Sequence, residues 1–210
     1  MKQLRLGTRL PDDAVTLGES QEAFIETALK GIRTIVFNVH GVLTSGRIHL
    51  ASFDNVQNGG IHLGGADEIL VFSATDRPRV SVATKLGIRV ALISGRRSSA
   101  LTKRAEEMHA NLFCKRKPDG TTLMPAELFG ELGRGANRVL VVGDDWNDIP
   151  YMAAAGVSAA PASAREEVFG YTHFITAAKG GEGVASEVVE RVLRAQDKWD
   201  EAVRIGMEMA

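Results

Sequence analysis

Short apolar runs alternate with amphipathic segments along most of this chain. The runs are rich in β-branched side chains, which is typical of strands that are buried on both faces. The segments between them carry apolar residues at helical spacing, as in Phe24, Ile25, Ala28, Leu29 and Ile32. We therefore expect strands at residues 34–39, 88–93, 111–114, 138–143, 157–160 and 173–176, and helices at residues 21–32, 98–110, 122–132, 148–155 and from 183 to 195 or beyond.

The repetition of strand and helix predicts the fold class. Consecutive βα units build a parallel sheet with helices on both faces, because parallel neighbours need a crossover connection. We expect an α/β fold with a three-layer, Rossmann-like parallel sheet. Any ligand of such a sheet is expected at the carboxyl ends of the strands.

Residues 46–72 depart from this alternation. Two near-copies of Ile-His-Leu, at residues 48–50 and 61–63, lie on either side of Asn58-Gly59. An Asn-Gly pair between β-prone runs is a strong signal for a tight hairpin turn. We expect a small β-hairpin insertion after the first strand, projecting from the main body.

No low-complexity segment or linker divides the 210 residues, and this length suits one domain. We expect an α/β domain over residues 33–200. An N-terminal extension at residues 1–32 would contain the first amphipathic helix, and residues 201–210 would form a C-terminal tail.

Composition excludes some functions without choosing one. The net charge of −1 gives no reason to expect a nucleic-acid partner. No apolar run approaches the roughly 20 residues that a membrane-spanning helix needs, and residues 1–13 lack the apolar core of a signal peptide. Cys114 is the one cysteine, so no internal disulfide can form. We expect a cytoplasmic protein with no membrane partner.

Polar side chains suited to phosphate chemistry stand at the ends of four predicted strands. They lie in residues 38–41 (Asn-Val-His-Gly), 94–96 (Ser-Gly-Arg), 115–120 (Lys-Arg-Lys-Pro-Asp-Gly) and 143–148 (Gly-Asp-Asp-Trp-Asn-Asp). Lysine and hydroxyl groups bind phosphate oxygens, and carboxylates bind a hard divalent metal. Together these groups predict a site for a phosphate with a divalent cation.

Each group also has a simpler structural interpretation. Ser94 would cap the following helix, residues 117–120 would form a solvated turn with proline at its second position, and residues 143–145 would form a polar turn. The occurrence of every group at a strand end, in this order, favours the phosphate site.

The motifs GVLTSGRI, ALISGR, VGDDWNDIPYM and GGEGVASEVVERVL carry a family resemblance. Between residues 34 and 199 the chain resembles haloacid dehalogenase (HAD) superfamily phosphatases, in particular the small 3-deoxy-D-manno-octulosonate 8-phosphate phosphatases. It is also similar to the phosphatase-like domain of some sialic acid-activating enzymes. The resemblance implies a HAD-like fold, a sugar phosphate ligand, Mg2+ as cofactor and a homotetramer whose hairpins meet around a central axis.

In this family the first loop reads Asp-x-Asp-Gly, and here Asn38 and His40 stand at the two aspartate positions. The first aspartate attacks phosphorus and ligates the metal, and the second transfers protons while its backbone carbonyl ligates the metal. A neutral amide is a poor nucleophile, and loss of a nucleophile commonly lowers the rate on the order of 10⁴-fold. The resemblance therefore implies a homologue with little or no phosphatase activity that keeps a phosphate or sugar-phosphate pocket.

His40 leaves three interpretations open. Its imidazole titrates near neutral pH and can serve as a general acid or base. The side chain can equally fill the loop structurally, and a phosphohistidine is the third and least favoured interpretation. The backbone carbonyl of His40 is available to a metal in each case.

The resemblance implies further roles for the loops after the later strands. Ser94 and the backbone N–H groups of Gly95 and Arg96 would hold the phosphate. Lys117 would neutralise the phosphate charge, with Lys115 as the alternative.

The last of these loops would supply the metal ligands. Asp144 would ligate Mg2+ directly, and Asp145 and Asp148 would support the ion, in part through water. Because Asn38 brings no charge, Mg2+ is expected to bind weakly.

Three residues outside these motifs carry separate expectations. Arg77 stands where similar sequences usually have glycine, and it would pair with a carboxylate or phosphate or else obstruct the pocket. His49 and His62 lie in the hairpin region. No third ligand stands at suitable spacing, so solvated or interface side chains are favoured over a transition-metal site.

Three functions therefore remain open. The first is a degenerate family member that acts as a binding or regulatory subunit. The second is an active Mg2+-dependent phosphomonoesterase in which His40 activates water. The third is a structural homo-oligomer without a ligand, in which the apolar hairpin is covered by other copies. Retention of the acidic loop at residues 143–148 argues against the third.

Overall fold

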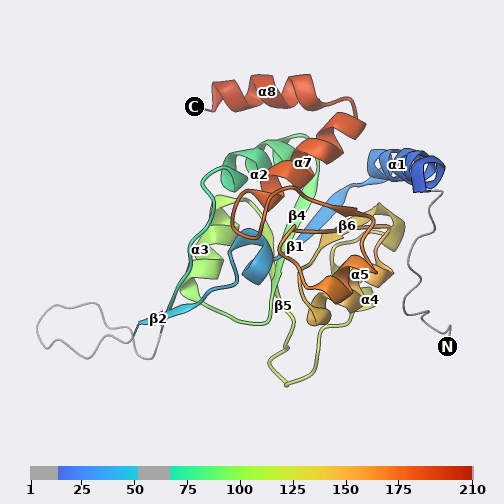
Figure 1. The fold of residues 1–210 in the computed structure, drawn as a ribbon. Helices are drawn as coiled ribbons and strands as arrows, with labels where there is room; N and C mark the ends of the chain where they lie inside the picture. The colour runs from blue at the N-terminus through green and yellow to red at the C-terminus, as the bar shows by residue number, and fades with distance from the viewer. Residues whose placement is uncertain (1–13, 52–66, 210) are drawn as a thin grey trace, which may run out of the picture.

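A six-stranded parallel sheet forms the centre of the computed structural model, which describes residues 14–51 and 67–209 (Figure 1). The strands lie in the order β5-β4-β1-β6-β7-β8, and every pair in this sheet is parallel. The predicted α/β fold is confirmed. The strands are β1 (Thr34–Asn38), β4 (Arg89–Ser94), β5 (Asn111–Cys114), β6 (Val139–Val142), β7 (Val157–Ala160) and β8 (Phe174–Ile175).

Helices cover both faces of the sheet and complete three layers. Alternate strand residues point to opposite faces: Phe37 and Leu92 belong to the larger apolar core, and Val36 and Ile93 to the smaller one. The larger core lies under α1 (Ala14–Gly31), α2 (Asp76–Lys85), α3 (Ser99–Glu107) and α7 (Val184–Ala195), and the smaller under α4 (Pro125–Glu131), α5 (Ile149–Ala154) and α6 (Glu166–Phe169).

Among the described helices, none is long and apolar enough to cross a membrane.

The observed helices differ from the predicted ones mainly near the chain ends and after the insertion. The first helix begins at residue 14 rather than at residue 21. The sequence pattern does not predict α2, because Pro78 and β-branched residues obscure its periodicity; the proline is tolerated in the first turn. Residues 201–210, expected as a tail, lie largely within α8 (Trp199–Glu208), which packs against α2 and α7 (Figure 1).

The expected insertion contains an antiparallel pair of strands that is separate from the main sheet, β2 (His49–Ala51) and β3 (Asp67–Ile69). β2 leaves the main body at the left of Figure 1. The predicted Asn58-Gly59 turn and His62 lie outside the described residues. The antiparallel pairing of β2 and β3 agrees with the predicted β insertion.

Close backbone contact holds the loop that follows β1. The N–H group of Gly181 donates to the carbonyl oxygen of Val42 at 2.9 Å. A Cβ atom on Gly180 would lie 2.1 Å from the carbonyl oxygen of Gly41, so no larger residue fits there without moving the backbone. The glycine-rich segment before α7 therefore braces the first loop from the far end of the chain.

We predict that Gly180→Ala lowers the free energy of unfolding by about 2 kcal/mol or more, because the added methyl group displaces the first loop. Gly130→Ala in α4 is the matched control. An added Cβ there has nothing within 4 Å, so stability should be unchanged or higher. Urea denaturation measures both variants, and equal stabilities would contradict the packing described.

Candidate functional site

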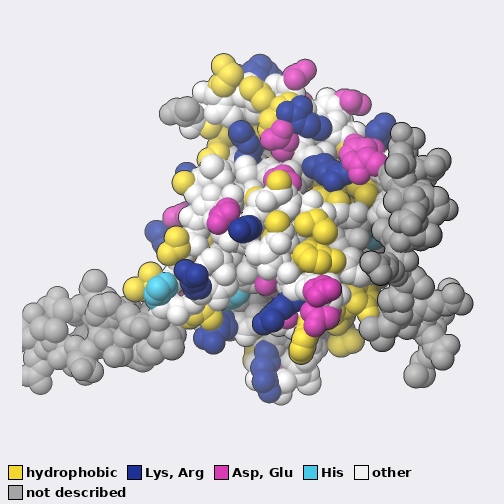
Figure 2. All heavy atoms as spheres, in the orientation of Figure 1, with side chains coloured by type: hydrophobic (Ala, Val, Ile, Leu, Met, Phe, Trp, Pro, Cys, Tyr) yellow, Lys and Arg dark blue, Asp and Glu magenta, His cyan; other side chains and the backbone are white. Residues whose placement is uncertain are grey.

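The loops after β1, β4, β5 and β6 meet around one cavity of about 350 Å³. They converge because parallel strands place their carboxyl ends at the same edge of the sheet. Figure 2 shows several Lys and Arg side chains on the lower part of the molecule. The cavity is lined by Asn38, His40, Gly46, Ile48, Gly95, Arg96, Lys115, Asp144, Asp145 and Asn147.

Asn38, the last residue of β1, is buried, and its amide nitrogen is surrounded by acceptors. Nδ2 donates hydrogen bonds to the His40 carbonyl oxygen (2.9 Å), to Asp144 Oδ1 (2.8 Å) and to Asp148 Oδ2 (3.0 Å). The acceptors come from the loop after β1 and from the loop after β6. The amide therefore ties the two loops together.

Asp148 organises the loop after β6. Its Oδ2 also accepts the backbone N–H groups of Asp144 (2.9 Å) and Asp145 (3.3 Å). Its Oδ1 lies 2.5 Å from Lys115 Nζ, and the two side chains are 2% and 10% exposed. Lys115 also donates to Asn147 Oδ1 at 2.7 Å. Asp148 and Lys115 thus form a buried, hydrogen-bonded ion pair.

The position of Lys117 corrects the expectation that this side chain faces the phosphate. Lys117 Nζ donates to Glu127 Oε1 at 2.7 Å at the surface, and this hydrogen bond raises the pKa of Lys117. Residues 117–120 form the solvated turn that was the simpler interpretation. Lys115 directly follows β5, so the sheet keeps it at the strand end, whereas the turn carries Lys117 outwards.

Ser94, the last residue of β4, is buried, and its Oγ accepts the N–H group of Arg96 at 3.0 Å. Ser98 rather than Ser94 caps α3, because the Ser98 side chain accepts the N–H group of Leu101 at 3.3 Å. Ser94 Oγ lies 3.5 Å from His40 Nδ1. The capping interpretation of Ser94 is therefore wrong, and its hydroxyl group faces the first loop.

His40 lies between Ser94 and an acidic residue that the motifs do not contain. Its Nε2 lies 3.8 Å from Glu68 Oε2, and the Glu68 side chain is 6% exposed. Burial is the largest influence on the pKa of His40 and lowers it, Glu68 raises it, and Arg96 and Lys115 lower it; the pKa lies below its ordinary value, which favours the neutral imidazole at pH 7. Glu68 belongs to β3, and no sequence signal marks it, because only the folded insertion brings it to His40.

The carboxylate of Asp144 lies in a poorly solvated position. Burial, and then the negative charge of Asp148, raise the pKa of Asp144 to about 7, while Asn38 and Lys115 act in the opposite direction. Gly41, at φ 84°, packs directly against this carboxylate, since a Cβ atom there would lie 1.8 Å from Asp144 Oδ2. Glycine is required at residue 41 for both reasons.

The family resemblance implies a divalent cation at this point, and the groups as they lie do not fit one. The candidate ligands are Asp144 Oδ1, Asp148 Oδ2 and the His40 carbonyl oxygen, and all three face Asn38 Nδ2. An amide N–H group donates hydrogen bonds and cannot coordinate a cation. Within the described part of the chain, no group of three or more His, Cys, Asp or Glu side chains is arranged to hold a metal ion.

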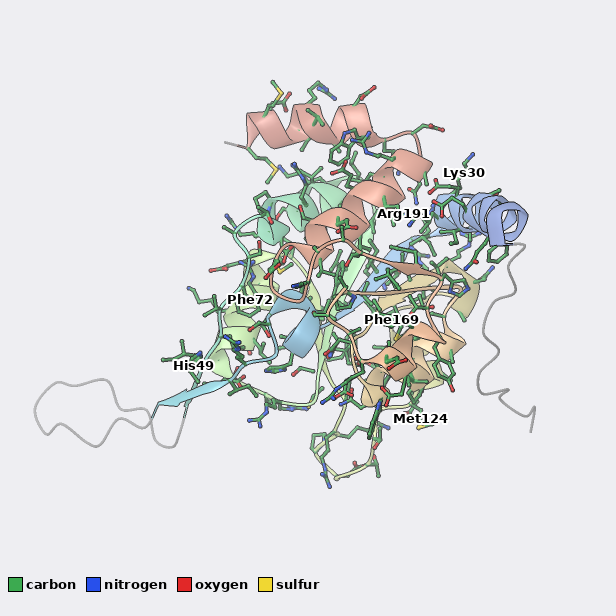
Figure 3. The ribbon with its side chains drawn as sticks, in the orientation of Figure 1. Lys30, His49, Phe72, Met124, Phe169 and Arg191 are labelled. Atoms are coloured by element: carbon green, nitrogen blue, oxygen red, sulfur yellow. The ribbon has the colours of Figure 1, made fainter. Side chains whose placement is uncertain are left out.

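Three other predicted residues have separate positions. Asp145 lines the cavity, and its Oδ1 accepts the N–H group of Trp146 at 2.7 Å. Arg77 Nε donates to the carbonyl oxygen of Glu107 at 3.3 Å, outside the cavity, which it therefore does not obstruct. His49 is exposed at the start of β2 and does not line the cavity (Figure 3).

A second cavity, of about 510 Å³, adjoins the first and shares Gly95, Lys115 and Asn147 with it. Its wall is formed partly by Met124 and Tyr151, and Figure 3 shows Met124 at the lower end of the molecule before α4. The two cavities together offer a charged pocket beside a more apolar one.

Known proteins are similar to this chain over most of its length. Residues 126–188 match the family described as haloacid dehalogenase-like hydrolase. The 3-deoxy-D-manno-octulosonate 8-phosphate phosphatase KdsC of Yersinia pestis is 30% identical over 176 residues, which are 84% of this chain and 87% of that protein. The chain belongs to the haloacid dehalogenase superfamily. Within this superfamily it falls in the 3-deoxy-D-manno-octulosonate 8-phosphate phosphatase-like subgroup.

Solved structures of this superfamily share the arrangement of the sheet. The crystal structure of the Yersinia pestis phosphatase matches with a TM-score of 0.71 and 28% identity, covering 84% of this chain and 89% of that one. The cobalt-bound form of the Haemophilus influenzae phosphatase YrbI matches with a TM-score of 0.68 and 28% identity, covering 82% and 93%. The HAD-like fold that the resemblance implies is therefore confirmed.

We predict that Lys115→Met lowers the free energy of unfolding of this HAD homologue by roughly 3 kcal/mol, because it leaves the Asp148 carboxylate buried without its partner. Lys117→Met is the matched control, since the Lys117 side chain pairs with Glu127 at the surface, and its unfolding midpoint should not change. Chemical denaturation of both variants tests this. An effect of Lys117→Met as large as that of Lys115→Met would contradict the assignment.

Proposed function

We propose that this chain binds a phosphate or a sugar phosphate at the strand ends and hydrolyses phosphomonoesters slowly or not at all. The observation that carries the proposal is the neutral side chain of Asn38 and its hydrogen bonds. A neutral amide lies at the end of β1, and its nitrogen is held by Asp144, Asp148 and the His40 carbonyl oxygen. Because an amide has no negative charge with which to attack phosphorus, covalent transfer fails at its first step.

The groups around the cavity support the binding of an anion. Arg96 and Lys115 both line it, and the N–H groups at Gly95 and Arg96 precede α3. We assign to Lys115 the charge-neutralising role that the family pattern gives to a lysine. The adjoining cavity would receive the rest of the phosphorylated molecule, beside Met124 and Tyr151.

The relatives supply the substrate class and the kind of cofactor for the proposal. The Yersinia pestis relative is named as a phosphatase of an eight-carbon sugar phosphate, and the Haemophilus influenzae structure holds cobalt. For this chain we propose a sugar phosphate ligand and a weak affinity for Mg2+. Two features support a weak affinity: Asn38 brings no negative charge, and its amide nitrogen faces the candidate ligands.

Hydrolysis assays test the proposed function. We predict no turnover above background for a panel of sugar phosphates with Mg2+ and the unmodified chain. The double variant Asn38→Asp with His40→Asp should regain turnover, because it restores the nucleophile and the acid–base group. Thermal shift with the same phosphates should detect binding without turnover. Substantial turnover by the unmodified chain would overturn the proposal.

A second candidate function is supported by the surroundings of His40. Its neutral imidazole, between Ser94 and Glu68, is suited to remove a proton from water, which makes an active phosphomonoesterase the alternative. The same assay separates the two candidates. Turnover that His40→Gln abolishes and Asn38→Ala preserves would establish the alternative.

We also propose that the chain forms a homotetramer through the insertion that contains β2 and β3. Ile69, the last residue of β3, and Val71, just after it, are 53% and 70% exposed, and adjacent exposed apolar side chains are a feature of protein interfaces. Light scattering coupled to size-exclusion chromatography should give four times the chain mass of 22.6 kDa. A clean monomer would rule the tetramer out. Residence in the cytoplasm stays a prediction.

A further inference from the structure

The Asn38 side chain lies where the acidic loop needs positive charge. Three acceptor oxygens converge on Nδ2, at 2.9 Å from the His40 carbonyl, 2.8 Å from Asp144 Oδ1 and 3.0 Å from Asp148 Oδ2. The amide group has two hydrogen atoms, so one of them is shared between two acceptors. Its partly positive hydrogens face the same set of oxygens that would otherwise face a cation.

The orientation of the amide is fixed by its neighbours. Turning it over would bring Oδ1 against the same three oxygens, and the His40 carbonyl has no hydrogen to donate. An acceptor facing acceptors in a buried position is unfavourable, because the hydrogen bonds of Asn38 to the His40 carbonyl oxygen and to Asp144 Oδ1 would be replaced by contacts between oxygen atoms. A cation that recruited Oδ1 as a ligand would first have to displace all three hydrogen bonds.

The protein also supplies the remaining charge compensation itself. Asp148 pairs with Lys115 at 2.5 Å, and its Oδ2 accepts two backbone N–H groups. Among the buried side-chain atoms without a hydrogen-bond partner in the described residues, none belongs to Asn38, Asp144 or Asp148. Asp148 is therefore fully hydrogen-bonded by groups of this chain, and Asp144 Oδ1 receives the Asn38 amide.

We propose that the Asn38 amide takes the place of the divalent cation, so that it holds the two loops together and keeps the cation out. The inference rests on the proposed function, because it explains how a phosphate pocket persists in a chain with weak metal affinity. In this role the amide substitutes for the cation, and phosphate binding does not depend on a divalent metal.

The competing explanation for weak metal binding is that Asn38 merely lacks a negative charge. The two explanations predict different metal affinities for the Asn38→Ala variant. If Asn38 merely lacks charge, its amide oxygen still serves as a neutral ligand, and Asn38→Ala should bind metal less tightly than the unmodified chain. If the amide nitrogen occupies the cation position, Asn38→Ala removes the obstacle and should bind metal more tightly.

Titration with Mn2+, followed by the electron paramagnetic resonance signal of the free ion, measures these affinities on the full chain. We expect the order Asn38→Asp, then Asn38→Ala, then the unmodified chain, with at least tenfold between the last two. Asn111→Asp, at the start of β5, makes the same chemical change at an exposed position and should bind like the unmodified chain. If Asn38→Ala does not fold, Asn38→Ser replaces it.

Tighter or equal Mn2+ binding by the unmodified chain, compared with the Ala or Ser variant, would overturn the inference. Calorimetry with inorganic phosphate in the presence of EDTA separates this failure from failure of the proposed function. Phosphate binding that EDTA leaves unchanged supports the inference, and binding that requires Mg2+ contradicts it. Absence of phosphate binding under every condition would contradict the proposed function. The order of Mn2+ affinities would still decide the role of the amide.

Discussion

Carboxylates that crowd together in one loop and are partly or fully buried must be compensated by cations or hydrogen-bond donors, and the rest of this site follows from that constraint. Partial burial, and then the negative charge of Asp148, raise the pKa of Asp144 to about 7. Asp148 is compensated by Lys115 and by backbone N–H groups. The amide of Asn38 completes the set by donating to both carboxylates.

The scaffold makes this compensation possible by bringing distant segments to one edge of the sheet. β1 and β6 are neighbouring parallel strands, so Asn38 and Asp144 meet although they are far apart in the sequence. Gly41 allows the first loop to approach the Asp144 carboxylate, and Gly180 allows the late glycine-rich segment to approach Gly41. Asn38 therefore lies at the start of a loop that close backbone packing holds on both sides.

Much of the fold could be predicted because the buried strands are short β-branched runs whose pattern survives without tertiary information. α2 could not, because its position follows from packing against α7 rather than from its own periodicity. Within the site, the strand-end rule located Asn38 and Asp144. Spacing alone could not choose between Lys115 and Lys117, since the choice depends on where the turn after β5 begins.

Glu68 and the amide orientation lay beyond any reading of the motifs. Glu68 reaches His40 only through the pairing of β2 with β3, and the hydrogen bonds of Asn38 depend on three acceptors from two loops. Anomalous diffraction from crystals of the unmodified chain soaked in Mn2+ tests the central claim most directly. The account predicts no peak between Asp144 and Asp148 in the unmodified chain and a clear peak in Asn38→Asp. A peak in the unmodified chain, with Asn38 Oδ1 among its ligands, would contradict it.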